Sequence, residues 1–326
     1  MNILVCGSEG SLMQATIPYL LKMGHSVSGV DSFFRYGKLD RKRDYDFIEG
    51  DLCDIDLASK VCNDIDVVFQ AAARIFGVVG FHKYGADILA KDTALHQNIL
   101  WEALNSNVQK VVYISSSMVY ERATKVPSEE DDVDDMPIPL TDYGLSKLVG
   151  ERLCKAFYQQ YGLKYTIWRP FNIITPYEKG EVEAGMSHVF ADFIWKIVIE
   201  RQNPVQILGD GEQVRCFTWI EDVASAIAKY SLESVTDGKA FNLGNPNPIT
   251  MKELASKIYN VAKSKGFITG KAELAFEYLP IFEDDVRVRI PSIQKAKAML
   301  GWEPQVHLEE ALQRCIQQSG TNLESC

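Results

Sequence analysis

The stretch Asn2-Ile-Leu-Val-Cys-Gly-Ser-Glu-Gly-Ser-Leu-Met13 decides the fold of this 326-residue chain. Residues 3–6 form a short apolar run typical of a buried strand, and residues 11–23 repeat apolar side chains at helical spacing. Gly7 and Gly10 lie between them, where Gly7 permits a tight turn and Gly10 lets the backbone approach a ligand. We therefore expect a strand, a glycine turn and a helix whose N-terminal amides attract phosphate.

Further strand and helix patterns alternate through the first half of the chain. Strands are predicted at residues 27–30, 46–49, 67–70, 111–114 and 165–168, and the clearest helices at residues 85–105 and 142–161. Alternation of this kind implies right-handed crossovers between parallel strands. The predicted fold class is therefore α/β, with a doubly wound parallel sheet.

The pattern changes after about residue 170, where prolines and glycines become frequent and irregular loops separate the helices. At roughly 150 residues per domain, the chain has room for about two domains. We predict a first domain of residues 1–170 with about 215–242. A smaller α/β lobe would comprise residues 171–214 and 243–326, and the ligand would lie in the cleft between them.

An acidic residue ends the second predicted strand. Asp31 lies roughly 20 residues beyond the glycine turn, where a carboxylate accepts hydrogen bonds from the ribose of a dinucleotide. A carboxylate repels a 2′-phosphate, so the pattern favours NAD, although the nearby Arg35 leaves NADP open. Asp51 and Leu52 follow the third strand and are placed to hold the adenine in the same cleft.

The helix at residues 142–161 begins with Tyr143-Gly-Leu-Ser-Lys147. A spacing of four residues puts the phenol and the ammonium on one helix face. A cation beside a phenol favours the phenolate, so we expect Lys147 to lower the pKa of Tyr143 and make it a general acid/base. The alternative interpretation is an ordinary pair of surface residues.

Three serines, Ser115 to Ser117, follow the strand at residues 111–114. The carboxyl ends of strands in an open α/β sheet face the ligand crevice. A serine hydroxyl there can bind a substrate hydroxyl and stabilise developing negative charge on oxygen. The alternative interpretation is a polar strand end without a function.

Composition excludes several classes of protein. The net charge is −10, from 34 basic and 44 acidic residues, which argues against nucleic acid as a partner. The best apolar stretch, residues 190–199, is short and contains Asp192 and Lys196, so no membrane span is expected. The first ten residues lack a basic segment and run directly into a strand pattern, so no signal peptide is expected. Seven scattered cysteines without CxxC pairs indicate a reducing cytoplasm, and five unclustered histidines indicate no metal site. The acidic run at residues 129–135 is expected to be a solvated loop.

The motifs together resemble those of an extended short-chain dehydrogenase/reductase of the NAD-dependent nucleotide-sugar epimerase/dehydratase family. They run nearly end to end: Gly7 and Gly10, Asp31, residues 49–52, 70–73, 115–120, Tyr143 with Lys147, and residues 169–172, 207–215, 285–287 and 300–304. The resemblance implies a Rossmann-like sheet domain, NAD as cofactor, a nucleotide-sugar substrate and a homodimer.

The resemblance also implies roles for individual residues. Tyr143 would be the acid/base, Lys147 would hold the nicotinamide ribose, and Ser116 would be the family's catalytic serine or threonine, with Ser117 as the fallback. The cofactor would contact Gly7, Gly10, Ser11, Leu12, Asp31, Asp51, Leu52, Ala71, Ala72, Tyr143, Lys147 and Phe171. The substrate would contact Ser117, Asn172, His188, Arg215 and Arg287. Among these, Asn172 and Arg215 would bind the diphosphate, for which a guanidinium is suited.

Several positions depart from the family pattern. Glycine is replaced by Met13 and by Thr175, histidine by Gln70, asparagine by Asp92 and aspartate by Cys216. These departures bear mainly on the geometry around the cofactor.

The reaction class depends on the residue after Ser117. Family dehydratases, decarboxylases and 3,5-epimerases resemble one another in carrying a proton-transfer group near this position, whereas Met118 has none. By elimination, redox epimerisation fits best, with C4 as the usual position in the family, although acids could arrive from other loops. The alternatives are a 4,6-dehydratase, a decarboxylase or a 4-oxidase of the same family, and an NAD-binding regulator without turnover.

Overall fold

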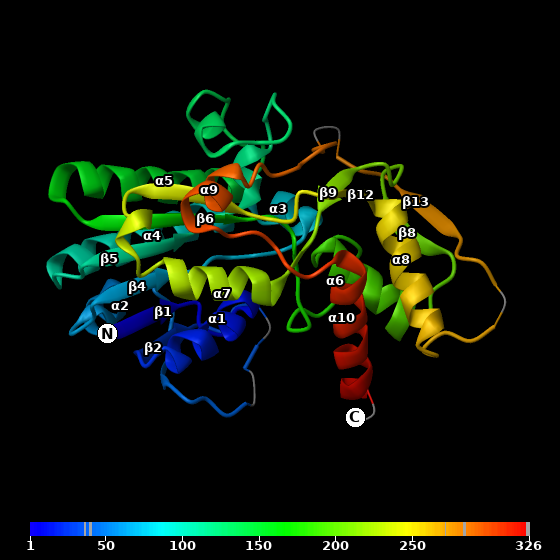
Figure 1. Cartoon of the computed structure of the whole chain (residues 1–326), viewed down its shortest axis with the longest axis horizontal. Coiled ribbons are helices and arrows are strands. Elements are labelled where there is room, and N and C mark those ends of the chain that lie inside the picture. The colour runs from blue at the N-terminus through cyan, green and yellow to red at the C-terminus, as the bar shows by residue number, and fades with distance from the viewer. Residues whose placement is uncertain (36, 39–40, 271, 283–284, 324–326) are drawn as a thin grey trace.

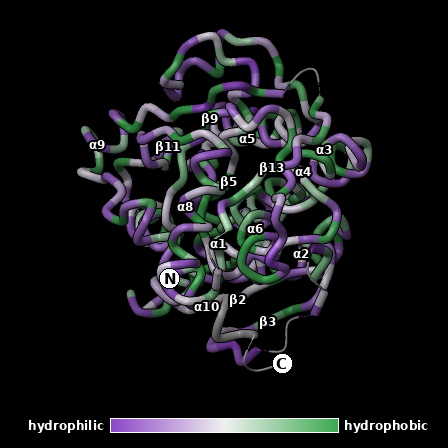
Figure 2. Tube along the Cα trace, turned by 90° about the vertical axis from the view of Figure 1, so that its right-hand side faces the viewer, coloured by the Kyte–Doolittle hydropathy of each residue, from purple (hydrophilic) through white to green (hydrophobic). Residues whose placement is uncertain are grey.

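The computed structural model describes residues 1–35, 37–38, 41–270, 272–282 and 285–323. A larger part built on one sheet lies beside a smaller lobe that contains the C-terminal helix (Figure 1). Coloured by hydropathy, the trace is mostly hydrophobic along the inner strands and more hydrophilic on the outer loops (Figure 2).

The larger part is a seven-stranded parallel sheet, which confirms the predicted fold class. In spatial order the strands are β11 (Lys239–Leu243), β6 (Lys164–Pro170), β5 (Lys110–Ile114), β4 (Val67–Gln70), β1 (Asn2–Cys6), β2 (Ser26–Asp31) and β3 (Asp46–Glu49). The chain order reverses between β1 and β4, and an open sheet leaves its ligand crevice at such a point.

Helices cover both faces of the sheet because its strands are apolar on both sides. In β1, Ile3 and Val5 pack into one core and Leu4 and Cys6 into the other, as alternation along a strand requires. The first core includes side chains of α1 (Ser11–Lys22) and α7 (Ile220–Tyr230). The second core includes side chains of α2 (Ile55–Cys62), α4 (Gly85–Asn105) and α5 (Asp142–Tyr161).

The smaller lobe packs its helices around a third core, in which Phe190, Phe193, Ile197 and Leu254 are buried. Its helices are α6 (Val189–Ile194), continued by a π-helical turn (Trp195–Ile199), α8 (Met251–Ser264) and α10 (Leu308–Leu323). Three strand pairs border them: β7 (Ile173–Ile174) with β10 (Thr218–Trp219), β8 (Val205–Leu208) with β13 (Phe276–Leu279), and β9 (Val214–Cys216) with β12 (Pro248–Thr250).

Two further helices connect these layers. The short α3 (Val78–Lys83) precedes α4, and α9 (Gln294–Leu300) packs against β11. The indole of Trp302 donates a hydrogen bond of 3.2 Å to the carbonyl of Asp222 in α7, and Ala296 is buried in the sheet core. Residues 293–302 therefore pack on the sheet although they follow the lobe in sequence.

The acidic run before α5 is more ordered than expected. Residues Glu130–Asp134 form a 3₁₀ helix, and Glu130 is buried, with its carboxylate accepting the backbone N–H of Asn242 at 2.8 Å. The prediction of a wholly solvated loop is therefore wrong for Glu130, which ties this loop to β11.

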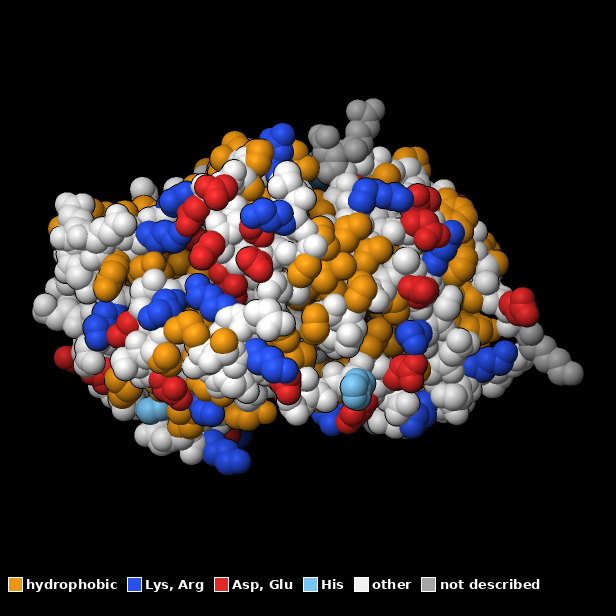
Figure 3. Space-filling model, turned by 45° about the horizontal axis from the view of Figure 1, so that its top comes forward, with side chains coloured by type: hydrophobic (Ala, Val, Ile, Leu, Met, Phe, Trp, Pro, Cys, Tyr) orange, Lys and Arg blue, Asp and Glu red, His pale blue; other side chains and the backbone are white. Residues whose placement is uncertain are grey.

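The surface shows no concentration of one charge on the face displayed in Figure 3, where basic and acidic side chains are interspersed around apolar ones. In the part of the chain that the structure describes, no helix combines the length and apolar character needed to cross a bilayer.

Candidate active site

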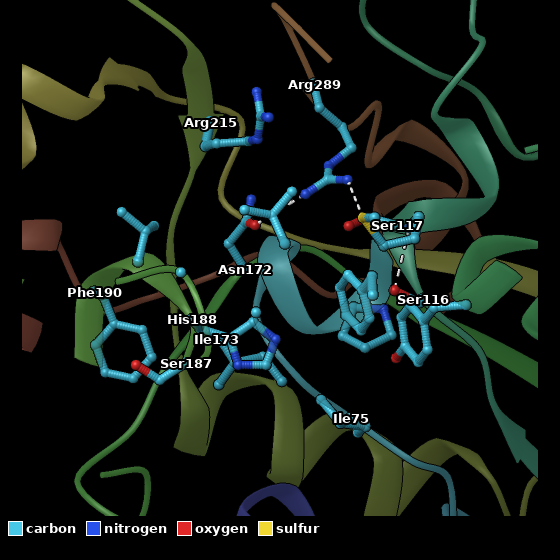
Figure 4. Close-up of a pocket in the computed structure, with 18 of the residues that line it drawn as sticks. Ile75, Ser116, Ser117, Asn172, Ile173, Ser187, His188, Phe190, Arg215 and Arg289 are labelled. Carbon is cyan, nitrogen blue, oxygen red and sulfur yellow. Dashed lines mark hydrogen bonds between the residues drawn. The ribbon is translucent and has the colours of Figure 1, made fainter. Parts of the chain in front are cut away.

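A cavity of about 360 Å³ lies where the sheet meets the lobe (Figure 4). The sheet side contributes the glycine turn, the serines after β5 and the start of α5. The lobe side contributes Ser187, His188 and Phe190 near α6, and Arg215 on β9. The cavity thus joins motifs that are far apart in the sequence.

The glycine turn fits a phosphate-bearing ligand. Gly7 has a φ of +76°, and a Cβ there would approach the backbone of Ala72 to 2.8 Å. Gly10 caps α1 without a side-chain hydrogen bond, so the first-turn amides of Ser11 and Leu12 remain available at the cavity wall.

Met13 occupies the place of a third glycine. Its side chain is buried in the core between the sheet and α1. A larger side chain is therefore accommodated behind the turn, and the cavity side of the turn keeps Gly7 and Gly10.

Asp31 holds the glycine turn in place. Its carboxylate accepts the backbone N–H of Glu9 at 2.9 Å and that of Phe33 at 2.8 Å. Burial raises the pKa of Asp31, and these two hydrogen bonds oppose the increase. Arg35 points towards the lobe, where its guanidinium binds Glu181.

The predicted Tyr143–Lys147 pair lies inside the cavity wall, so it is not an ordinary surface pair. Tyr143 and Lys147 are 5% and 2% exposed. The phenol ring stacks on Phe81 with centroids 4.3 Å apart. The Lys147 ammonium lies 5.8 Å from the Tyr143 ring centroid and donates to the carbonyl of Ile114 at 2.9 Å.

The electrostatics of this pair differ from the prediction. Burial raises the pKa of Tyr143, opposed by contact with the Ser116 hydroxyl. Burial lowers the pKa of Lys147 to about 8, opposed by the charges of Asp92 and Glu151. The expected lowering of the phenol pKa is therefore wrong for the protein alone, because desolvation outweighs the Ser116 hydrogen bond and the charge of Arg289.

The three serines after β5 have separate partners. Ser115 donates to the buried carboxylate of Glu151 at 2.5 Å. Ser116 accepts the backbone N–H of Met118 at 3.1 Å and touches Tyr143, while Ser117 is buried in the cavity wall. Ser116 is thus the serine next to the phenol.

Two arginines form the opposite wall of the cavity. Arg215 has its nearest carboxylate, Asp285, at 3.8 Å, and burial together with repulsion from Arg289 lowers its pKa to about 9. Arg289 is 7% exposed and donates to the amide oxygen of Asn172 at 3.2 Å, but its Nε has no partner among the described residues. Two close, incompletely paired guanidinium groups favour an anionic ligand.

A sequence comparison agrees with this geometry. Residues 3–244 match the model of a family described as the NAD dependent epimerase/dehydratase family. The chain belongs to this family. Its members' use of NAD fits the open glycine turn and the cavity around Tyr143.

Curated relatives of this epimerase/dehydratase chain span different reactions. It is 29% identical to a UDP-N-acetyl-alpha-D-glucosaminuronate decarboxylase of Bacillus cytotoxicus, with 96% of each protein covered. It is 26% identical to a UDP-glucuronate 4-epimerase of Thermodesulfobacterium geofontis, covering 98% of this chain and 97% of the relative.

A solved structure shows the same fold. The UDP-glucose 4-epimerase of Thermotoga maritima with UDP-glucose superposes with a TM-score of 0.85 at 26% identity, over 99% of this chain and all of that one. The chain thus has the fold of the epimerase/dehydratase family. The named relatives act on nucleotide sugars, and the reaction differs among them.

Several predicted site residues of this family member lie outside the cavity lining. Asp51 pairs with Arg74 at 3.2 Å, Leu52 is buried, and Phe171 is fully buried against Tyr120. The residues of the predicted set that line the cavity are Gly7, Gly10, Ser11, Leu12, Ala71, Ser116, Ser117, Tyr143, Lys147, Asn172, His188 and Arg215.

Arg287 also lies outside the cavity, and its neighbour takes the expected place. Arg287 forms a two-pronged, exposed pair with Asp210 at 3.0 and 2.9 Å. Arg289, which sequence reasoning missed, lines the cavity instead. The segment Val-Arg-Val-Arg carried the signal for an arginine but not for which of the two.

The family departures at Gln70 and Asp92 are buried beside the cavity. The amide of Gln70 contacts His96 at 3.2 Å. The carboxylate of Asp92 accepts the backbone N–H of Arg74, at 3.0 and 3.2 Å from its two oxygens. Both side chains therefore have protein partners and stabilise the segment that follows β4.

Proposed function

We propose that this chain is an NAD-dependent nucleotide-sugar epimerase that inverts C4 through a transient 4-keto sugar. The observation that carries the proposal is the meeting of Tyr143, Ser116 and Lys147 with the glycine turn in one cavity. The family resemblance implies that dehydratases, decarboxylases and 3,5-epimerases carry a proton-transfer group near position 118. Met118 offers no such group.

The residues of the cavity divide into an anion end and a reactive end. Arg215, Arg289 and Asn172 would bind the diphosphate, and this proposal replaces Arg287 by Arg289. The turn at Gly7 and Gly10 would hold the cofactor phosphates. Five predicted cofactor residues lie outside the cavity lining and would support the residues that line it. They are Asp31, Asp51, Leu52, Ala72 and Phe171.

At the reactive end, Tyr143 would take the proton of the C4 hydroxyl and later return it, while Ser116 donates a hydrogen bond to the same oxygen. NAD, when bound, supplies the acceptor and donor of the C4 hydride. Lys147 would hold the cofactor ribose, and its positive charge would favour the phenolate form of Tyr143 against the opposing effect of burial. Rotation of the keto sugar before hydride return would give the C4 epimer.

The test uses purified protein with UDP-glucose, UDP-glucuronic acid, dTDP-glucose, CDP-glucose and GDP-mannose. Products are separated by ion-exchange chromatography and weighed by mass spectrometry. We expect a new peak of unchanged mass from one of these sugars. A product that has lost water or carbon dioxide would overturn C4 epimerisation in favour of a dehydratase or decarboxylase, and accumulation of reduced cofactor would indicate a 4-oxidase.

The variant Tyr143→Phe separates an enzyme from a cofactor-binding regulator. Loss of the phenol hydroxyl should lower turnover by roughly 100-fold or more. Binding of the cofactor, followed by the fluorescence of bound NADH, should change little. Unchanged turnover in this variant would contradict the assigned role of Tyr143.

We also propose a homodimer through α4 and α5. Trp101 and Tyr161 are each 43% exposed, with their rings 5.7 Å apart, so the two helices present an aromatic surface. Light scattering should give twice the chain mass, and Trp101→Glu should give the monomer mass. A monomeric wild-type protein would contradict this proposal.

We propose two further properties of the chain, its division into domains and its cellular location. We keep the division into a sheet domain and a nucleotide-sugar lobe, with residues 293–302 assigned to the sheet because of Trp302. We also propose a cytoplasmic location, supported by six unpaired cysteines in the described part of the chain. Titration of accessible and denatured thiols in freshly purified protein checks the second proposal.

A further inference from the structure

A histidine and a glutamate form a pair at the lobe side of the cavity. The Nδ1 atom of His188 lies 2.7 Å from Oε1 of Glu178, and the same oxygen accepts the backbone N–H of His188 at 3.0 Å. The side chain of Glu178 is 5% exposed and that of His188 is 46% exposed. The glutamate is thus buried and the ring is exposed; both residues line the cavity, and Figure 4 shows the ring there.

The pair fixes which ring nitrogen is available. Burial alone would raise the pKa of Glu178, but contact with His188 lowers it, so the carboxylate is ionised near neutral pH and accepts a hydrogen bond from Nδ1–H. Within the described residues the hydrogen bond of the ring is made by Nδ1, and none is made by the other nitrogen, Nε2. A carboxylate that orients a histidine in this way leaves a lone pair ready to take a proton.

The charges around His188 suit proton transfer near neutral pH. Burial lowers the pKa of His188 and Glu178 raises it, while Arg35 and Arg289 oppose Glu178; the net shift is upward. Arg289 also contacts the sulfur of Met118, so the ring shares its arginine neighbour with the serine end of the cavity (Figure 4).

Simple C4 inversion gives His188 only the substrate contact predicted from the sequence, and gives the pair no proton to transfer. Tyr143 already serves the C4 hydroxyl, and the diphosphate is assigned to Arg215 and Arg289. A ketone at C4 acidifies the C–H bonds of the carbons on either side, which are the bonds a neutral histidine can break.

We propose that His188 is a second acid/base group, which exchanges a proton at a carbon next to the transient ketone. This inference rests on the keto sugar of the proposed function. It adds an activity, because the product then carries a solvent-derived hydrogen on that carbon.

The step balances within the sugar and the protein. Nε2 of His188 takes the proton, and the electron pair of the C–H bond forms the C=C bond of an enolate. The negative charge moves to the keto oxygen, where Tyr143 and Ser116 donate hydrogen bonds. A proton returns to the carbon from His188 after exchange with solvent, or from water on the opposite face, which inverts the carbon. The ketone is restored before hydride returns to C4.

The test is turnover in D₂O with each of the five nucleotide sugars named above. Recovered sugars are weighed and the deuterium is located by NMR. We expect one deuterium on a carbon next to C4. Product without deuterium, or deuterium elsewhere in the sugar, would overturn the role of His188 while leaving C4 epimerisation intact. Absence of nicotinamide reduction with all five sugars would instead refute the proposed function, and this inference with it.

His188→Gln removes the base but keeps an N–H that can bind Glu178. We expect deuterium uptake to fall by roughly 100-fold or more, whereas transient nicotinamide reduction, which depends on Tyr143, persists. The matched control is His307→Gln, because His307 is exposed outside this cavity and should leave both readouts unchanged. Equal loss of nicotinamide reduction and deuterium uptake in His188→Gln would show a role in binding alone.

Glu178→Gln tests the positioning residue. Removing its charge should lower the pKa of His188, measured by NMR titration of the ring protons, because the opposing charges of Arg35 and Arg289 remain. Deuterium uptake rises with pH as His188 loses its proton, so the midpoint of that rise should move to lower pH. An unchanged ring pKa and pH profile would contradict the orientation by Glu178.

Discussion

Arg169 and the two cavity arginines differ in how their charges are compensated. Arg169, on β6, gives Glu151 two hydrogen bonds of 2.8 and 2.6 Å and binds the hydroxyl of Tyr120 and the carbonyl of Glu130. Arg215 and Arg289, at the cavity, repel one another, and within the described residues their one ion pair is the 3.8 Å contact of Arg215 with Asp285.

The difference teaches how to tell a structural charge from a binding charge. Burial alone would lower the pKa of Arg169, but Glu151 and Tyr120 raise it overall. The pKa of Arg215 and that of Arg289 are both lowered, because burial there is only partly compensated. A buried guanidinium that is paired with a buried carboxylate stabilises the fold, whereas buried guanidinium groups without such a close partner favour an anionic ligand.

The largest effect is expected where the compensated pair is broken. Glu151→Gln leaves the guanidinium of Arg169 buried and without its counter-charge, so the free energy of unfolding should fall by about 3–5 kcal/mol. Urea denaturation measures it. The control is Glu183→Gln, whose exposed pair with Lys83 is screened by solvent and should contribute little to the free energy of unfolding. Similar losses in both variants would remove the distinction drawn above.

The cavity arginines should behave in the reverse way. Arg289→Met should weaken binding of a nucleoside diphosphate by roughly 30- to 1,000-fold, or about 2–4 kcal/mol, with no loss of unfolding free energy. Calorimetric titration with UDP, dTDP, CDP and GDP measures affinity, and urea denaturation measures stability. Unaltered affinity combined with reduced stability would make Arg289 a structural residue like Arg169.

Glu9 is a second buried charge that has close partners of its own, and the pH dependence of stability tests their effect. Burial would raise its pKa, but Arg41, Arg43 and Tyr45 lower it from 4.5 to about 2. Because the folded pKa is the lower one, the stabilisation is present above pH 4.5 and is lost as the pH falls to about 2. It amounts to roughly 3 kcal/mol. Acid unfolding followed by circular dichroism should lose this dependence in Glu9→Gln; an identical acid transition would contradict it.

The smallest effect is expected at Arg287. Its pair with Asp210 is exposed on both sides and screened by solvent, so Arg287→Met should leave the unfolding free energy nearly unchanged. Affinity for the same diphosphates should stay within a few-fold, which makes it the matched control for Arg289→Met. A loss of affinity equal to that of Arg289→Met would restore the assignment made from the sequence.

Local sequence patterns predicted the helices and strands better than they predicted the contacts between side chains. The helices at residues 85–105 and 142–161 have the predicted bounds, because long amphipathic runs specify their own extent. Tyr143 and Lys147 lie at the cavity as expected, since a spacing of four fixes one helix face. The sign of the Tyr143 pKa shift was not predictable, because desolvation depends on residues such as Phe81 that come from another helix.

In the lobe, too, local sequence patterns do not predict which side chains come into contact. Glu178 and Arg289 carry no motif of their own, and each gains its place through contacts across more than a hundred residues or through one irregular loop. Nothing in the local sequence distinguishes Arg289 from Arg287, although one is buried at the cavity and the other is exposed. Loop residues of this kind are positioned by the elements around them.

The sequence by itself determined the parallel sheet, the glycine turn and the tyrosine–lysine helix, because the periodicity of apolar residues and the conformational freedom of Gly7 are local properties. Only the tertiary structure decided which charges are compensated. Packing set Glu151 against Arg169, left Arg215 beside Arg289, and placed His188 on Glu178. Burial and pairing depend on distances between segments remote in sequence, and those distances govern both stability and the chemistry of the cavity.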